Sequence, residues 1–103
     1  MRAPTLGRMP SYLVETYLPR GRAGERKART RRACSAALEL TREGIRVRFE
    51  RSIHVPEDET CFFVFDAPSG ESAALAAERA ALGPLRVVQA IASTSKEAIK
   101  EKR

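Results

Sequence analysis

The alternation of apolar and polar residues along the chain predicts four strands, of which the second shows it most clearly. Positions 45–49 alternate strictly between apolar and charged residues, the period of a half-buried strand. Two later apolar residues continue the same set, so we expect one strand over 45–55. The side chains expected together on its apolar face are Ile45, Val47, Phe49, Ile53 and Val55.

Three other stretches, 11–18, 60–66 and 85–92, are rich in β-branched and aromatic residues and are also predicted strands. The strand at 60–66 is apolar on both faces, with Cys61, Phe63 and Phe65 on one and Phe62 and Val64 on the other. A strand of this kind is normally covered on both sides. Two helices can cover only one face of a four-stranded sheet, so the second face must meet another subunit, a ligand, or the two ends of the chain.

Two helices are predicted from apolar residues spaced three and four apart. The first, over 25–43, has a stripe formed by Ala33, Ala37 and Leu40, widened by Cys34 and Leu38. Gly44 is its expected end. The second, over 70–82, begins after the N-cap candidate Ser69 and ends at Gly83-Pro84.

The resulting order β-α-β-β-α-β predicts an α+β, ferredoxin-like split βαβ fold, with a four-stranded antiparallel sheet and both helices on one face. We expect residues 1–10 to be a leader, 11–93 the domain, and 94–103 a charged tail that can begin a short helix at Thr94. A second subunit on the uncovered sheet face would make this a dimeric α+β barrel.

Composition narrows the class of protein. The chain of 103 residues has room for one domain, no apolar run long enough to span a membrane, and no secretory signal after its first arginines. Cys34 and Cys61, the two cysteines, are expected to be buried free thiols. Together these features predict a cytoplasmic protein.

The net charge of +6 is concentrated in one basic segment, residues 20–32, which holds a single acidic residue, Glu25. Its basic residues are Arg20, Arg22, Arg26, Lys27, Arg29, Arg31 and Arg32. Such a cluster could bind phosphates, and nucleic-acid association is one functional hypothesis. The segment contains no aromatic residue on which a base could stack, and this weakens the nucleic-acid hypothesis.

Candidate chemistry centres on His54, the only histidine, at the end of the second strand. Glu50 and Asp66 are the acidic residues that could complete a metal site with it, because imidazole and carboxylate donors together suit nickel or zinc. The same three groups could act as acid and base in a dimeric barrel enzyme, a second hypothesis. The alternative for each is an ordinary solvated or strand-end side chain. Glycine-rich phosphate loops and nucleophile motifs are absent, so the sequence gives no positive case for catalysis.

Several segments resemble a family of small bacterial proteins catalogued as a domain of unknown function, or as nickel-binding-protein-like. They are 9–15, 49–55, 60–69, and 77–79 with Gly83, and the resemblance covers about residues 9–92. The most specific part is Cys-Phe-x-x-x-Asp-Ala-Pro-Ser at 61–69.

This resemblance implies a ferredoxin-like fold, a homodimer packed sheet to sheet, and a relative that binds nickel, with His54 as the residue carried over. The chain departs from a metal-rich pattern because it has no second histidine and has Arg79 in the last motif. The leading hypothesis is therefore a non-enzymatic homodimeric binding protein with a metal or small-ligand site near His54.

Overall fold

The structure, a computed structural model, describes residues 9–93 and residue 95. In chain order the elements are β1 (Ser11–Tyr17), the 3-10 helix η2 (Arg20–Glu25), α1 (Arg26–Arg42), β2 (Arg48–Val55), the 3-10 turn η3 (Pro56–Asp58), β3 (Thr60–Asp66), α2 (Gly70–Arg79) and β4 (Pro84–Ala90). The tail helix predicted from Thr94 lies outside the described residues. Within them, no helix is long and apolar enough to cross a membrane.

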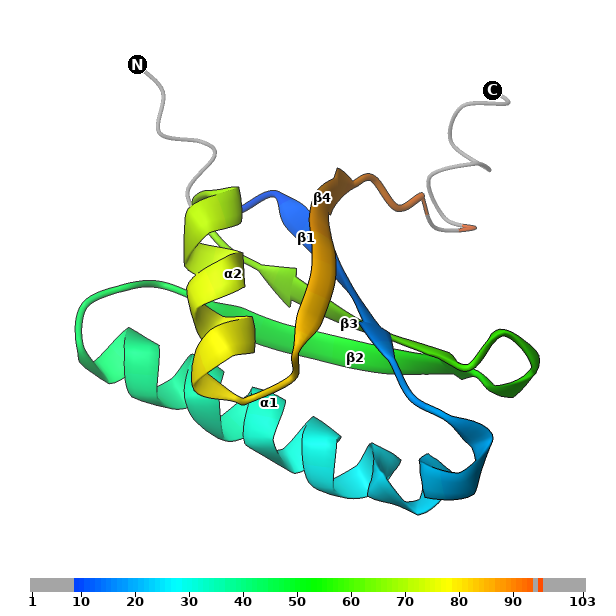
Figure 1. The fold of residues 1–103 in the computed structure, drawn as a ribbon. Coiled ribbons are helices and arrows are strands. Elements are labelled where there is room, and N and C mark those ends of the chain that lie inside the picture. The colour runs from blue at the N-terminus through cyan, green and yellow to red at the C-terminus, as the bar shows by residue number, and fades with distance from the viewer. Residues whose placement is uncertain (1–8, 94, 96–103) are drawn as a thin grey trace.

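The four strands form one antiparallel sheet in the order β2-β3-β1-β4. Both helices lie on the same side of this sheet (Figure 1). The predicted β-α-β-β-α-β order is confirmed, and the topology is consistent with a ferredoxin-like fold. β2 and β4 are the edge strands, while the doubly apolar β3 lies inside the sheet, as its sequence predicts.

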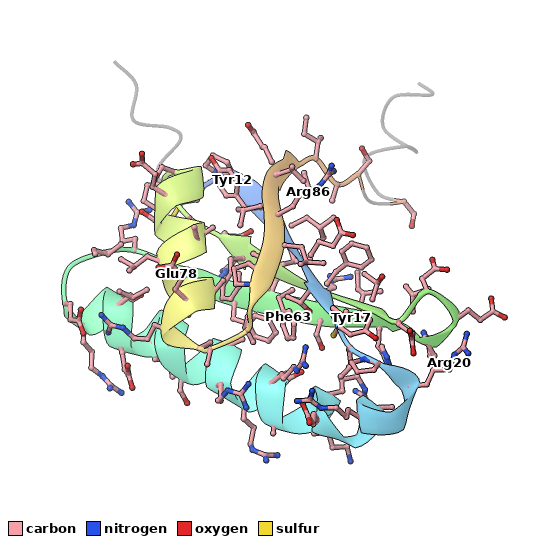
Figure 2. The ribbon with its side chains drawn as sticks, in the orientation of Figure 1. Tyr12, Tyr17, Arg20, Phe63, Glu78 and Arg86 are labelled. Atoms are coloured by element: carbon pink, nitrogen blue, oxygen red, sulfur yellow. The ribbon has the colours of Figure 1, made fainter. Side chains whose placement is uncertain are left out.

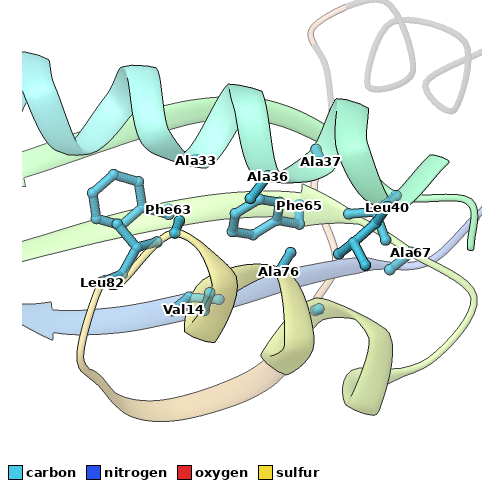
Figure 3. Packing of buried hydrophobic residues seen from close by; sticks show 14 of the residues in the cluster. Val14, Ala33, Ala36, Ala37, Leu40, Phe63, Phe65, Ala67, Ala76 and Leu82 are labelled. Atoms are coloured by element: carbon cyan, nitrogen blue, oxygen red, sulfur yellow. The ribbon is translucent and has the colours of Figure 1, made fainter. Parts of the chain in front are cut away.

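The core lies between the helices and the sheet, where large side chains from β3 meet small ones from the helices (Figure 3). Phe63 and Phe65 are completely buried, and the ring of Phe49 lies 6.3 Å and 5.5 Å from theirs, centroid to centroid. The helices contribute mainly alanines, among them Ala33, Ala36, Ala37, Ala73, Ala76 and Ala77. Because alanine adds little bulk, both helices pack close to the sheet and the phenylalanine rings fill the layer between them.

The sequence signals locate the start of α2 and the end of α1, whereas α2 ends at Arg79 and not at the predicted residue 82, because Ala81 already adopts a left-handed φ of +56°. The hydroxyl of Ser69 accepts a hydrogen bond from the backbone N–H of Ser72 at 3.1 Å, which makes Ser69 the predicted N-cap of α2. Gly44 and Gly83 follow the helices with φ of +98° and +64°, in the left-handed region that glycine adopts without strain.

The predicted stripe of α1 is wrong at two positions. Cys34 is exposed, and the side chain of Leu38 is 54% exposed. Each helical residue advances about 100° around the axis, so a buried set centred on Ala33, Ala36, Ala37 and Leu40 leaves positions 34 and 38 more than 90° from its centre. Cys61 is buried as expected, whereas the exposed thiol of Cys34 contradicts the prediction of two buried cysteines.

Candidate functional site on the open sheet face

The sheet face away from α1 and α2, termed here the open face, carries no element among residues 9–93 that covers it. Strand registers place on it Ser11, Leu13, Glu15 and Tyr17 from β1, Thr60, Phe62, Val64 and Asp66 from β3, Arg86, Val88 and Ala90 from β4, and Arg48, Glu50, Arg51, Ile53 and Val55 from β2. Its apolar members include Tyr17 and Ile53, which are 55% and 44% exposed.

A β-bulge at Glu50 decides which β2 side chains reach the open face. Phe49 pairs with Phe65 and Arg51 pairs with Val64, so Glu50 is an extra residue without a partner on β3. An extra residue reverses the alternation that follows it. The prediction that Ile53 and Val55 share the face of Phe49 is therefore wrong, because both lie on the open face.

The bulge places Glu50 beside Asp66, the last residue of β3. Asp66 Oδ1 accepts a hydrogen bond from the hydroxyl of Ser11 at 2.8 Å, and Oδ2 accepts one from the Arg48 guanidinium at 2.9 Å. The same Arg48 nitrogen lies 2.6 Å from Glu50 Oε2. The Asp66 side chain is only 11% exposed and that of Glu50 is 30% exposed. We call Glu50 and Asp66 the carboxyl pair.

The two acids of the carboxyl pair have pKa values that move in opposite directions. The hydrogen bond to Asp66, together with burial, raises the pKa of Glu50 above its ordinary value. Burial alone would raise the pKa of Asp66, but hydrogen bonds from Glu50, Ser11 and Arg48 outweigh it and lower that pKa. Glu50 is therefore the weaker acid of the pair and Asp66 the stronger one.

This arrangement gives the open face two neighbouring carboxyl groups of unlike acidity. Such a pair can bind a ligand with an ammonium or amidinium group, or exchange a proton with it. The Arg48 side chain is 69% exposed, so its guanidinium is the cation nearest solvent at the pair. A cationic ligand group could take its position without disturbing the core.

His54 lies apart from the carboxyl pair. It pairs with Cys61 in the β-ladder and lies on the helix side of the sheet, as does Ser52, whose hydroxyl is 3.0 Å from that of Thr30 on α1. Cys61 and Asp66 are five positions apart on β3, about 16 Å along the strand. The structure thus brings Glu50 and Asp66 together, and leaves His54 on the opposite face near the other end of the strand.

The surroundings of His54 are buried. Its Nε2 atom is shielded from solvent and has no hydrogen-bond partner among the described residues. Burial raises the pKa of the neighbouring Cys61 thiol and so keeps it protonated. Within residues 9–93, no three His, Cys, Asp or Glu side chains lie close enough together to hold a metal ion. Two further acids lie apart from His54: Glu15 lies 3.5 Å from Arg86, and Glu78 is exposed on α2 (Figure 2).

Four of the seven basic residues at 20–32 have partners inside the chain. Arg20, beside the β2–β3 hairpin (Figure 2), donates to the backbone oxygens of Pro56 and Glu57. Arg22 is paired with Glu25 at 2.7 Å, and Arg29 donates to the Tyr17 carbonyl at 3.0 Å. Arg32 donates to the carbonyls of Ala80 and Ala81. Only Arg26, Lys27 and Arg31 lack such partners among the described residues, so less of the basic segment is free to bind phosphates than the sequence predicts.

Sequence reasoning named Glu50 and Asp66 but grouped them with His54, and it missed Ser11 and Arg48. One signal was available: Glu50, Arg51 and Ser52 are three consecutive polar residues in a strand that otherwise alternates. Such a break in period is the expected mark of a bulge.

Comparison of the chain with protein-family models, curated proteins and solved structures finds no match. The family resemblance therefore stays a prediction.

Proposed function

We propose that the chain is a homodimeric binding protein whose two copies meet through their open sheet faces. The observation that carries this proposal is the contrast between the two sides of the sheet. The open face combines exposed apolar side chains with three basic and three acidic residues. The helix side, residues 20–43 and 70–79, holds nine basic and five acidic residues.

These charges decide which side a second copy would use. Five of the six charged side chains on the open face are paired internally, Arg48 with the carboxyl pair and Arg86 with Glu15, while Arg51 has no ion pair among the described residues. Positive and negative residues are equal in number there, so two such faces can approach without a net like-charge repulsion. Two helix sides would repel each other, because each carries an excess of positive charge. The apolar residues between the ion pairs would lose contact with water on association.

The dimer is tested by light scattering after size-exclusion chromatography, with two matched variants. Ile53→Glu adds a charge to the part of the open face formed by β2, and we expect it to give a monomer because the dimer would bury an unpaired carboxylate. Leu38→Glu adds the same charge at a similarly exposed position on α1 and should leave the dimer intact. A wild-type monomer at micromolar concentration, or equal effects of the two variants, would contradict the proposal.

Within this dimer, we propose that the carboxyl pair is the ligand-contacting group. The Phe62 and Val64 side chains lie on the same face as Asp66 and would form the apolar wall of the site. Small-ligand sites commonly combine such walls with a few converging polar groups. The unlike acidities of the two carboxyls also support a second function, acid–base catalysis on a small organic molecule, in which Glu50, the weaker acid, would donate a proton and Asp66 would stabilise the resulting positive charge.

Nickel is the probe that separates a site at the carboxyl pair from one at His54. We expect calorimetric titration of wild type and His54→Ala with nickel to give the same isotherm, because His54 has no converging donors among the described residues. Any saturable binding should be weakened by Glu50→Gln, which replaces an anionic carboxylate ligand by a neutral amide. Binding that is lost in His54→Ala and kept in Glu50→Gln would place the metal at His54 instead.

A further inference from the structure

A groove on the helix side, away from the open face, lies between α1 and the end of α2 and has a volume of about 540 Å³. Its polar lining consists of Arg31, Arg32, Ser35 and Glu39 from α1 and Arg79 from α2. Ala28, Ala36 and Ala80 form the rest of its wall. We call it the helix groove. Its volume falls within the range of small-molecule sites.

The helical period explains why these side chains meet in one place. Arg31, Ser35 and Glu39 are spaced four residues apart, so they lie above one another along one side of α1. The alanines between and opposite them leave the space open, because they carry no side chain beyond Cβ. The groove is thus a direct consequence of the alanine-rich surfaces on which the helices meet.

Two of the three arginines are held in place. Arg32 Nε donates to the Ala80 carbonyl at 2.7 Å, and one of its terminal nitrogens donates to the Ala81 carbonyl at 3.3 Å. Arg79 forms a two-bond ion pair with Glu43 and lies 3.5 Å from Glu39. Arg32 therefore keeps its second terminal nitrogen free in a fixed position, and its bonds engage backbone carbonyls that would otherwise attract cations to this end of α2.

Arg31 is the groove cation without an ion pair or hydrogen bond among residues 9–93 and 95. Beside it, the Ser35 hydroxyl can donate a hydrogen bond, so Arg31, Arg32 and Ser35 together offer donors to one oxyanion. The guanidinium plane matches the oxygens of a phosphate, which makes arginine well suited to recognise it.

We propose that the helix groove binds the phosphate group of a small phosphorylated molecule through Arg31, Arg32 and Ser35. Glu39, on the groove wall, and Glu43, beside Arg79, favour a small ligand over a nucleic acid, because a polyanion passing along the groove would meet both carboxylates. This site is independent of the proposed dimer, which uses the opposite face of the sheet.

The test is a titration of the full chain with pyrophosphate at constant ionic strength, followed by NMR of the arginine Nε–Hε groups. We expect saturable shifts at Arg31 and Arg32, and about a tenfold loss of affinity in Arg31→Gln, the size expected for one charge-assisted hydrogen bond. Arg42→Gln removes an equally exposed charge from the same helix outside the groove and should bind as wild type does.

Four outcomes would overturn the proposal. The first is a set of shifts that does not saturate or includes Arg42 equally. The second is equal affinity in the Arg31→Gln and Arg42→Gln variants. The third is tighter binding of a single-stranded oligonucleotide than of pyrophosphate, if that binding is lost when Arg26 and Lys27 are changed but kept when Arg31 is changed. This result would assign the basic surface to nucleic acid. Citrate as a parallel probe distinguishes phosphate from carboxylate ligands, and binding of citrate alone would also exclude a phosphate site.

Discussion

Phe62 and Phe63 are neighbours in the sequence with opposite surroundings, and they show how much depends on the direction of one side chain. Phe63 is fully buried beneath the helices, whereas Phe62 lies on the open face and is partly exposed. Replacing a buried phenylalanine by alanine typically costs about 3–5 kcal/mol, much of it from the cavity that remains. The stability of the domain therefore resides on the helix side of β3, which leaves the other side free for a partner.

Glu50 should make the folding stability of the protein depend on pH in a way that a glutamate with an ordinary pKa would not. Its pKa is raised by folding, so the stability that it contributes is complete below its unfolded pKa and is lost as pH rises through its folded pKa. Asp66 acts in the opposite sense, because its lowered pKa contributes stability that is lost as pH falls.

We predict that Glu50→Gln removes the loss of stability that Glu50 causes as pH rises. Glutamine can still donate a hydrogen bond to Asp66, but it has no proton to lose. Urea unfolding between pH 4.5 and pH 7.5 should show wild type losing stability relative to the variant as pH rises, by up to about 1 kcal/mol, as for partly exposed charged pairs. Glu78→Gln, at an exposed position on α2, is the control and should change in parallel with wild type. Parallel curves for wild type and Glu50→Gln would show that folding does not raise the pKa of Glu50.

At the scale of elements, Arg29 connects the first turns of α1 to the end of β1. Its side chain is 9% exposed, and it donates to the Tyr17 carbonyl and lies 3.4 Å from Glu25. The first turn of α1 contains no acidic residue that would interact favourably with the helix dipole. The contact between Arg29 and β1 therefore stabilises the start of α1, where the sequence itself provides no acidic residue to do so.

We predict that Arg29→Met lowers the free energy of unfolding by about 1–3 kcal/mol, because it leaves a partly buried carbonyl without its donor. The matched change Arg31→Met, two positions along the same helix but exposed, should alter it by less than about 0.5 kcal/mol. Chemical denaturation of both variants checks this expectation. Equal losses would mean that the effect comes from charge or helix propensity and not from the contact with β1.

The elements also show where sequence reasoning succeeds and fails. Periodicity found all four strands and both helices, because each buries one face and the spacing of apolar residues reflects that burial. It failed in two places. The bulge at Glu50 moves Ile53 and Val55 to the other face of the sheet, and the buried side of α1 excludes Cys34 and Leu38. The carboxyl pair could not be assembled in advance, since it depends on that bulge and on pairing between residues far apart in the chain.

The molecule as a whole has two unlike sides separated by one sheet. Its open face has equal numbers of basic and acidic residues and is partly apolar, whereas positive charges outnumber negative ones on the helix side. Within the basic segment, Arg20 contacts the hairpin and Arg32 contacts the end of α2. The carboxyl pair and the helix groove lie on opposite sides. Ligand binding at one can therefore be measured without blocking the other.

The uneven distribution of charge also sets how large an assembly can grow. In colloidal terms the proposed dimer would join the one attractive patch of each particle and leave the repulsive remainder outside. Both outer surfaces of that pair would be positively charged and would push further particles away at low salt. We therefore expect assembly to stop at two copies without a closed ring or a capping partner, and clustering to be governed by the salt concentration of the solution.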